Sequence, residues 1–389
     1  MKSIYLDWAA SAPINPDLPA FILKALLNFQ GNPSSVHTEG KNARNQINNS
    51  RKVCANLLGT KPEQLIFTSG GTDSNSIIVS SLFRKKSKGQ IIISAIEHPS
   101  IYVFSAALKD SGFDVIYITP DSDGFIDPND LKLLLKPSTI FVSIMTVNNE
   151  TGAIQPLETL ISVIRDFEQK NGRSIHIHTD AVQALGKIPF KPGLFDIDSA
   201  SFSAHKIGGP KGTGLLYLKK PIAVLSSGGG QEFAIRPGTE NTAGIIAFSK
   251  AMETSIKKLE NNMQHAEYLK SLLTTEFAAI EGVRILFSSA NEDNLSYSPY
   301  IISATVSPVP GEVLVRVLSD KGVFISTGSA CSSRNRKKQI RVLVSSGASE
   351  KDASGSIRIS TGWSTTEADI IDFCAILKPA LSELRKYLR

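Results

Sequence analysis

Lys206 is the first residue of this chain whose surroundings suggest covalent chemistry. It lies in the segment Ser201-Phe-Ser-Ala-His-Lys-Ile-Gly-Gly-Pro-Lys-Gly-Thr-Gly214, where a predicted strand runs into a glycine-rich turn. Ser201, Ser203 and His205 are small hydrogen-bonding groups that can hold a phosphate, and the glycines let the backbone approach a ligand closely. A lysine taken alone is more typical of a solvated surface charge. In this setting the Lys206 amine can form a Schiff base with a carbonyl cofactor.

Pyridoxal 5′-phosphate (PLP) is a carbonyl cofactor that needs such a lysine, an acidic partner for its pyridine nitrogen and a phosphate site. Asp180 supplies an acid candidate, because it ends a strand pattern 26 residues before Lys206. An isolated Asp after a strand is usually a helix cap. A further strand separates these two residues, however, and parallel strands present their carboxyl ends at one edge of a sheet. We therefore expect Asp180 and Lys206 to share one pocket.

Two glycine-rich turns are candidate phosphate sites. The segment Thr68-Ser-Gly-Gly-Thr-Asp-Ser-Asn75 follows a predicted strand and opens a predicted helix, so its free N–H groups around Gly71 and Thr72 favour an anion. The alternative is a plain turn in which Thr72 caps the helix. The second turn, 228–241, contains Thr239, whose hydroxyl can contact phosphate.

Polar side chains follow other predicted strands. His98 could stack on a planar ring, although a lone histidine is more often structural. Asn149 could hydrogen-bond a cofactor oxygen or a substrate carboxylate, or belong to an Asn-rich turn. Arg358 lies on a predicted strand and could clamp a substrate carboxylate, although alone it is more typical of a surface ion pair.

Cys331 has surroundings unlike those of the other two cysteines. It lies among small polar residues and precedes Arg334–Arg341, which carries five cations in eight residues. Nearby cations and exposure favour a thiolate. Cys374 instead lies in an apolar run, and Cys54 lies on a helical pattern over 43–58, so we expect both to be packed.

The order of predicted elements is typical of an α/β fold. Strands are predicted at 65–68, 91–94, 115–118, 140–145, 175–178, 199–202 and 215–218, and helices at 73–84, 100–109, 127–135 and 157–169. This alternation predicts a mostly parallel sheet covered on both faces. Beyond it the pattern predicts a long helical stretch over 244–277, short strands at 283–286, 301–306, 323–325 and 357–360, and a helix over 366–388. We expect residues 12–245 to form a large sheet domain, and residues 1–11 plus 246–389 a smaller α+β domain.

Composition excludes several classes of protein. Of the 389 residues, 41% are hydrophobic and 20% charged, which is ordinary for a globular chain. A net charge of +6, spread over the chain, argues only weakly for nucleic acid. The first residues contain no apolar run of signal-peptide length, and the sequence has no membrane-spanning run, CxxC pair or metal-ligand spacing, so we expect neither secretion nor membrane spanning. We expect a cytoplasmic protein with no metal, no membrane and no direct nucleic-acid partner.

With these motifs assembled, the chain resembles the cysteine desulfurases, in the class V aminotransferase branch of the fold-type I PLP enzymes. The resemblance covers essentially the whole chain, and its most specific parts are Ser-Phe-Ser-Ala-His-Lys206, Asp180-Ala-Val-Gln183, Asn148-Asn-Glu-Thr-Gly, Arg236-Pro-Gly-Thr and Gly-Ser-Ala-Cys331. The last is similar to the long-loop group that serves iron–sulfur assembly and tRNA thiolation. The family usually has glycine where this chain has Ala204, a change that removes no reactive group.

The resemblance implies a fold-type I PLP-transferase fold, with a seven-stranded large domain, and a role for each matching residue. Lys206 would hold PLP and move the substrate's Cα proton, and Asp180 would pair with the ring nitrogen. His98 would stack on the ring. The ring substituent would contact Gln183 and Asn149. The phosphate would be held by Gly71, Thr72, Ser203 and His205, and by Thr239 from the second subunit of a homodimer.

The resemblance also implies the reaction. Arg358, with Asn149, would bind the carboxylate of L-cysteine, and Cys331 would accept the sulfur as a persulfide for transfer to a protein acceptor, leaving L-alanine. Three alternatives stay open. They are a selenocysteine lyase or desulfinase, a class V aminotransferase that does not need Cys331, and a non-enzymatic basic module built on Arg334–Arg341.

Overall fold

The computed structural model describes residues 3–226, 228–288, 296–327 and 340–387. Seven strands form a central sheet in the order β2-β8-β7-β6-β5-β3-β4. They are β2 Leu65–Thr68, β3 Gln90–Ser94, β4 Asp114–Ile118, β5 Thr139–Ser143, β6 His176–Asp180, β7 Ser199–Ser203 and β8 Gly214–Leu218. Strands β4, β3, β5, β6 and β7 run parallel, and β8 is antiparallel to β2 and β7. The predicted mostly parallel seven-stranded sheet is confirmed.

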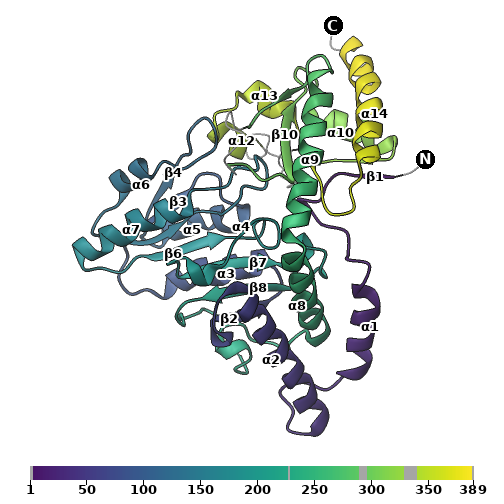
Figure 1. Ribbon diagram of the computed structural model, residues 1–389. Coiled ribbons are helices and arrows are strands. Elements are labelled where there is room, and N and C mark those ends of the chain that lie inside the picture. Colours follow the sequence, from purple (N-terminus) through teal and green to yellow (C-terminus); the bar gives the residue numbers. More distant parts are fainter. Residues whose placement is uncertain (1–2, 227, 289–295, 328–339, 388–389) are drawn as a thin grey trace.

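Helices cover both faces of this sheet (Figure 1). They are α2 Thr38–Leu58, α3 Gly71–Ser81, α4 Pro99–Tyr102, α5 Phe104–Asp110, α6 Pro128–Leu134, α7 Leu157–Asn171 and α8 Thr242–Lys257, and α1 Leu18–Asn28 packs against α8. Ile92 of β3 packs into a core with α2, α6, α7 and α8, whereas Ile91 and Ile93 pack with α3 and α5 on the opposite face. Alternate side chains of one strand therefore serve two cores, which explains why the strands are apolar throughout.

Two smaller sheets lie beside the central one. The first is antiparallel, in the order β12-β10-β9, and the second pairs β1 with β11 in parallel. Their strands are β1 Ile4–Tyr5, β9 Arg284–Ile285, β10 Ile301–Thr305, β11 Val323–Phe324 and β12 Ser356–Ser360. Their helices are α9 Leu259–Ala278, α10 Gly311–Asp320, α12 Arg341–Ser345, α13 Glu350–Ser354 and α14 Glu367–Lys386. The N-terminal strand therefore joins elements from the far end of the sequence.

The helical stretch expected over 244–277 is present, but it is divided in two. The structure has two helices, α8 and α9, that meet at Lys258, whose φ of −98° and ψ of 9° depart from helical values. The reason lies in packing, because Phe248 and Met252 of α8 belong to the core of the central sheet. Leu269 and Leu273 of α9 belong instead to the core of the smaller sheets. The apolar periodicity continues across the junction although the helix direction changes.

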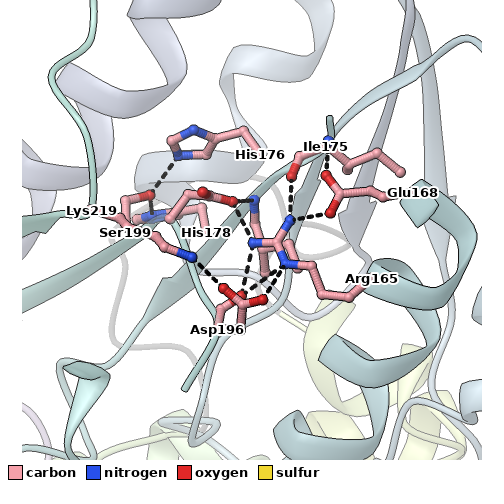
Figure 2. A network of polar contacts seen from close by, with 10 residues as sticks. Arg165, Glu168, Ile175, His176, His178, Asp196, Ser199 and Lys219 are labelled. Atoms are coloured by element: carbon pink, nitrogen blue, oxygen red, sulfur yellow. Dashed lines mark hydrogen bonds and ion pairs between the residues drawn. The ribbon is translucent and has the colours of Figure 1, made fainter. Parts of the chain in front are cut away.

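Arg165 fixes the start of the two strands that lead to Asp180 and Lys206 (Figure 2). It lies on α7, and its Nη2 is 2.8 Å from Oδ2 of Asp198, just before β7. The same Asp198 oxygen accepts the backbone N–H of Ile177 on β6 at 2.9 Å. One guanidinium thus ties α7 to the entry of both strands.

A buried ion pair holds the second glycine-rich turn against the sheet. Arg51 of α2 makes two 2.7 Å contacts with the Glu232 carboxylate, which also accepts the backbone N–H of Phe67 on β2 at 2.7 Å. Glu232, Phe233 and Ala234 all have positive φ, between 46° and 61°. Such backbone costs energy for residues with a side chain, so the ion pair stabilises a strained turn.

We predict that Glu232→Gln lowers the free energy of unfolding by about 3 kcal/mol, because the Arg51 cation stays buried without its partner charge. Urea unfolding measures this change. The control is Glu253→Gln, which breaks an exposed pair with Lys250 and should cost less than about 1 kcal/mol. An equal loss in the two variants would contradict the account.

Candidate active site

A cavity of about 740 Å³ opens where the parallel strands end. Its lining includes residues that follow β3, β5, β6 and β7, together with the N-terminus of α3, as expected for a parallel sheet. Predicted site residues in the lining are Gly71, Thr72, His98, Asn149, Asp180, Gln183, Ser203, His205, Lys206 and Arg358. The structure therefore brings together candidates that are spread over most of the sequence.

Lys206 ends a short 3₁₀ turn, Ala204–Lys206, directly after β7. Its Nζ donates hydrogen bonds to the backbone carbonyls of Ala9 and Ala10, each at 2.7 Å. The N-terminal segment thus forms one wall of the cavity beside the amine. Ser201, which we also considered as a phosphate group, does not line the cavity.

Asp180 is 5% exposed and lies in the same cavity, at the end of β6. Its Oδ2 accepts a hydrogen bond from Asn75 Nδ2 at 2.7 Å, and its Oδ1 accepts the backbone N–H of Val182 at 3.0 Å. The contact with Val182 is the short-range turn contact expected of an Asp after a strand. The contact with Asn75 is an additional one that orients the carboxylate within the cavity.

The N-terminus of α3 is open to an anion. No side chain caps it, so the alternative in which Thr72 is the cap is wrong. Gly70 has a φ of 154°, which favours glycine, and a Cβ on Gly71 would lie 2.5 Å from Cγ2 of Val182. The backbone N–H groups of this turn can therefore approach a phosphate closely.

His205 and Ser203 complete this end of the cavity. Burial and the nearby Lys206 lower the pKa of His205 to about 4, so its imidazole is neutral at neutral pH. A neutral ring has one N–H to donate to an anion.

His98 has a structural role and also lies at the cavity. It caps α4, because its Nδ1 accepts the backbone N–H of Ser100 at 3.2 Å, and it also lines the cavity. Burial lowers the pKa of His98, and the charge of Asp180 opposes that shift. A neutral imidazole at the cavity wall suits contact with a planar ring.

Arg358 is 2% exposed, so the alternative of a surface pair is wrong. Its Nη2 forms an ion pair with Asp7 at 2.8 Å, and its Nη1 donates to the backbone carbonyl of Asn149 at 2.8 Å. These contacts hold a buried guanidinium in the cavity lining, where it can bind a carboxylate.

Gln183 is held by a buried lysine that the sequence analysis did not single out. Its Nε2 donates to the Ala9 carbonyl at 2.9 Å, and its Oε1 accepts Lys187 Nζ at 2.6 Å. Burial, with the charges of Lys206 and Arg358, lowers the pKa of Lys187 to about 7.

Arg341, the last cation of the basic segment 334–341, lies at the cavity. Its guanidinium lines the cavity, donates to the carbonyls of Ala95 and Glu97, and lies 3.8 Å from the ring centroid of Tyr102. The cluster of neighbouring cations in the sequence hid this role. Burial raises the pKa of Glu97 to about 8, and that of Glu150, which also lines the cavity, to about 8.

Two groups of predicted residues lie elsewhere. Thr239 is exposed and is not part of the cavity lining. Cys331 lies outside the described residues, together with the cations Arg334, Arg336, Lys337 and Lys338. The described chain on both sides of this segment is at the site, because Ser326 pairs with Arg358 on β12 and Arg341 lines the cavity.

Asn75 and Asp7 are site residues that sequence reasoning missed. Asn75 ends the first glycine-rich segment and contacts Asp180. Asp7 lies in the N-terminal segment and pairs with Arg358. Only the fold shows that these partners meet.

The residues present fit PLP. The cavity brings together an amine, a buried carboxylate and an uncapped helix N-terminus flanked by glycines. These are the covalent, ring-nitrogen and phosphate contacts that PLP requires. Within the described ranges, no three His, Cys, Asp or Glu side chains gather as a metal site would need. Among the same residues, no helix is long and apolar enough to cross a membrane.

Comparison with known proteins gives consistent results. The model of the aminotransferase class-V family matches residues 4–373. Cysteine desulfurase IscS of Dictyoglomus turgidum is 36% identical over 388 residues, which cover 99% of this chain and 96% of that protein. A solved structure described as a NifS-like protein is 34% identical with a TM-score of 0.90, and the match covers 98% of this chain and 100% of that one.

A solved structure of SspA in complex with cysteine is 30% identical with a TM-score of 0.76, covering 92% of this chain and 98% of that one. Because the family model spans nearly the whole sequence and the relatives match along the same length, this chain belongs to the class-V aminotransferase family.

Proposed function

We propose that this chain is a PLP-dependent cysteine desulfurase, which converts L-cysteine to L-alanine. The observation that carries the proposal is one cavity that contains the Lys206 amine, the buried Asp180 carboxylate and the buried Arg358 guanidinium. The relatives named cysteine desulfurase, and the related structure that holds cysteine, support the same substrate.

Each of these residues has a role in binding. Lys206 would carry PLP, with Asp180 as acceptor for the ring nitrogen and His98 against the ring face. Gln183 and Asn149 would contact the ring substituent. The phosphate would bind the N–H groups of the α3 turn with the side chains of Thr72, Ser203 and His205. Bound PLP supplies an electron sink that lets the substrate Cα lose a proton.

The chain's own groups then divide the reaction between them. Arg358, held by Asp7, binds the substrate carboxylate together with Asn149 and so orients the Cα–H bond. Lys206 Nζ is the base that removes the Cα proton. The Cys331 thiolate would form a bond to the substrate sulfur as the Cβ–S bond breaks, which leaves a persulfide on Cys331. The electron pair of the broken bond stays with the substrate carbon, which is then protonated and leaves as alanine.

The assignment of Cys331 is supported by the chain on either side of it. Ser326 exchanges backbone hydrogen bonds with Arg358, at 3.2 Å and 2.7 Å. Arg341, on the other side, is anchored in the cavity wall. A segment that starts beside the proposed substrate-binding residue and ends at the cavity wall is well suited to supply the sulfur acceptor. No observation favours a selenocysteine lyase, an aminotransferase or a non-enzymatic module.

We further propose a homodimer in the cytoplasm, in which residues 12–245 form the PLP-binding domain and the remaining residues the smaller one. The 11-residue helix α1 exposes Phe21, Leu23, Leu26 and Leu27, which is unusual for a surface helix in a monomer. Thr239 is exposed and away from its own cavity, so it is available to the phosphate site of a second subunit.

A protein sulfur acceptor in iron–sulfur assembly or tRNA thiolation would take the persulfide sulfur, and the cations after Cys331 would favour an acidic acceptor.

Lys206→Ala should lose the covalent cofactor linkage, seen as loss of the visible absorption band, and all alanine production. The reason is that one amine both holds PLP and moves the Cα proton. Lys211→Ala, on the same glycine-rich turn, is the control and should keep both properties. Normal turnover by Lys206→Ala would contradict the proposal.

Cys331→Ala should keep PLP and still bind L-cysteine, yet form no protein persulfide and release sulfide at least about a hundredfold more slowly. Cys54→Ala and Cys374→Ala are matched controls, because both thiols are buried and burial raises each pKa to about 12. Sulfide release at the wild-type rate by Cys331→Ala would show that another group accepts the sulfur.

Leu23→Glu combined with Leu27→Glu should convert the protein to a monomer, because two charges would have to be buried in the proposed interface. Sedimentation velocity measures this, and the monomer should also retain PLP poorly. Leu133→Glu alters a single leucine that is 83% exposed on α6, and serves as the control. A dimer that survives the double substitution would refute this interface.

A further inference from the structure

Asn75 connects the two groups that would lie against the cofactor ring. It lies on α3, is fully buried and lines the cavity. Its Nδ2 donates to Asp180 Oδ2 at 2.7 Å and to Ser100 Oγ at 2.9 Å. Its Oδ1 lies 3.1 Å from His178 Nε2. One side chain therefore contacts Asp180 directly and, through Ser100, approaches His98.

The orientation of the Asn75 amide is determined by its partners. A carboxylate only accepts hydrogen bonds, so the atom 2.7 Å from Asp180 Oδ2 has to be the NH₂ group. The Asn75 oxygen therefore faces His178, and His178 Nε2 has to carry the proton that it donates. This assignment follows from chemistry and distance without regard to any titration.

The chain of hydrogen bonds continues along the sheet through His178, Ser199 and His176, which are shown in Figure 2. Because His178 is protonated at Nε2, its Nδ1 accepts, and it lies 2.8 Å from Ser199 Oγ. The Ser199 hydroxyl proton is thereby used, so Ser199 Oγ accepts from His176 Nε2, also at 2.8 Å. The donors point in one direction, from His176 through Ser199, His178 and Asn75 to Asp180.

A second branch leads to His98. Ser100 Oγ accepts from Asn75, so its own proton is available to His98 Nδ1 at 2.7 Å. The backbone N–H of Ser100 points to the same nitrogen at 3.2 Å. With two donors on Nδ1, His98 carries its proton on Nε2.

Burial supports neutral imidazoles throughout. It lowers the pKa of His178 to about 3, against a hydrogen bond with the Ser199 backbone, and that of His176 to about 4, against the charge of Asp198. Burial lowers the pKa of His98 as well. A doubly protonated His178 ring would be a buried positive charge, and its two hydrogen-bond partners, Ser199 Oγ and Asn75 Oδ1, are both uncharged.

We propose that Asn75 is a positioning residue that fixes Asp180 as an oriented carboxylate through the chain His176–Ser199–His178, and fixes His98 in its Nε2–H form through Ser100. A chain of aligned hydrogen bonds polarises its members and so strengthens the final donor to Asp180. Asp180 is thereby held as the acceptor for the ring nitrogen. The other end of the chain, His176, is not part of the cavity lining. The proposal rests on the proposed function in one respect, namely that PLP is the group that Asp180 faces.

Neutron diffraction from deuterated holoenzyme crystals tests the hydrogen positions directly. We expect deuterium on Nε2 and none on Nδ1 of both His178 and His98, and the Asn75 ND₂ group facing Asp180. Deuterium on Nδ1 of His178, or an Asn75 oxygen facing Asp180, would overturn the proposal. Wild-type protein that binds no PLP would instead overturn the proposed function, so the two failures are distinguishable.

Variants test the consequence for the cofactor. Protein loaded with ¹⁵N-labelled PLP reports the state of the ring nitrogen by NMR, and dialysis reports cofactor retention. Asn75→Ala removes a hydrogen bond to a charged group, so PLP affinity should fall roughly tenfold or more and the ring ¹⁵N signal should shift. Ser199→Ala should shift the same signal less, with a roughly two- to fivefold loss of affinity.

Matched serines separate the two branches from general destabilisation. Ser201→Ala removes the same atom from the same strand, but the Ser201 hydroxyl is buried without a hydrogen-bond partner in the described structure, so the ring signal should not move. Ser100→Ala removes one of the two donors to His98 Nδ1, but the backbone N–H of residue 100 remains, so His98 should keep its proton on Nε2. If Ser199→Ala leaves the ring signal at its wild-type position, as the control Ser201→Ala should, then Asn75 does not link the His176–Ser199–His178 chain to Asp180 and the proposal fails.

Discussion

The buried carboxylate of Asp180 is the constraint on which the rest of the site depends. A charged group that is 5% exposed is stable only if its environment supplies hydrogen bonds and compensating charge. The structure supplies hydrogen bonds from Asn75 and Val182, and places Lys206 in the same cavity. The end of β6 is therefore a fixed negative point around which the cationic groups of the cavity are arranged.

The cations of the cavity have their own constraints. Lys206 and Arg358 lie in one lining, and burial, together with these two charges, lowers the pKa of Lys187 to about 7. Asp7 forms an ion pair with Arg358, which anchors the N-terminal segment next to β12. The Ala9 and Ala10 carbonyls accept Lys206. The N-terminal segment thus supplies hydrogen-bond acceptors and a negative charge to the cations of the cavity, although it is far from the rest of the site in sequence.

Much of the fold and site could be predicted from the sequence, because parallel strands are apolar throughout and functional groups follow their ends. Asp180 ends such a strand, and Lys206 and His98 each lie shortly after one, so their shared cavity could be foreseen. The break at Lys258 could not, since apolar periodicity continues across it while the packing partner changes. Arg341 was hidden among neighbouring cations, and Asn75 was hidden because only tertiary structure shows that it meets Asp180.

The central claim is that this cavity transfers sulfur from L-cysteine to Cys331. Mass spectrometry of the intact wild-type holoenzyme after incubation with L-cysteine, together with quantification of the amino-acid product, tests it most directly. The account predicts a gain of one sulfur atom that maps to Cys331 after digestion, and one L-alanine for each sulfur gained. Unmodified protein with no alanine, or sulfur found on Cys54 or Cys374 instead, would contradict it.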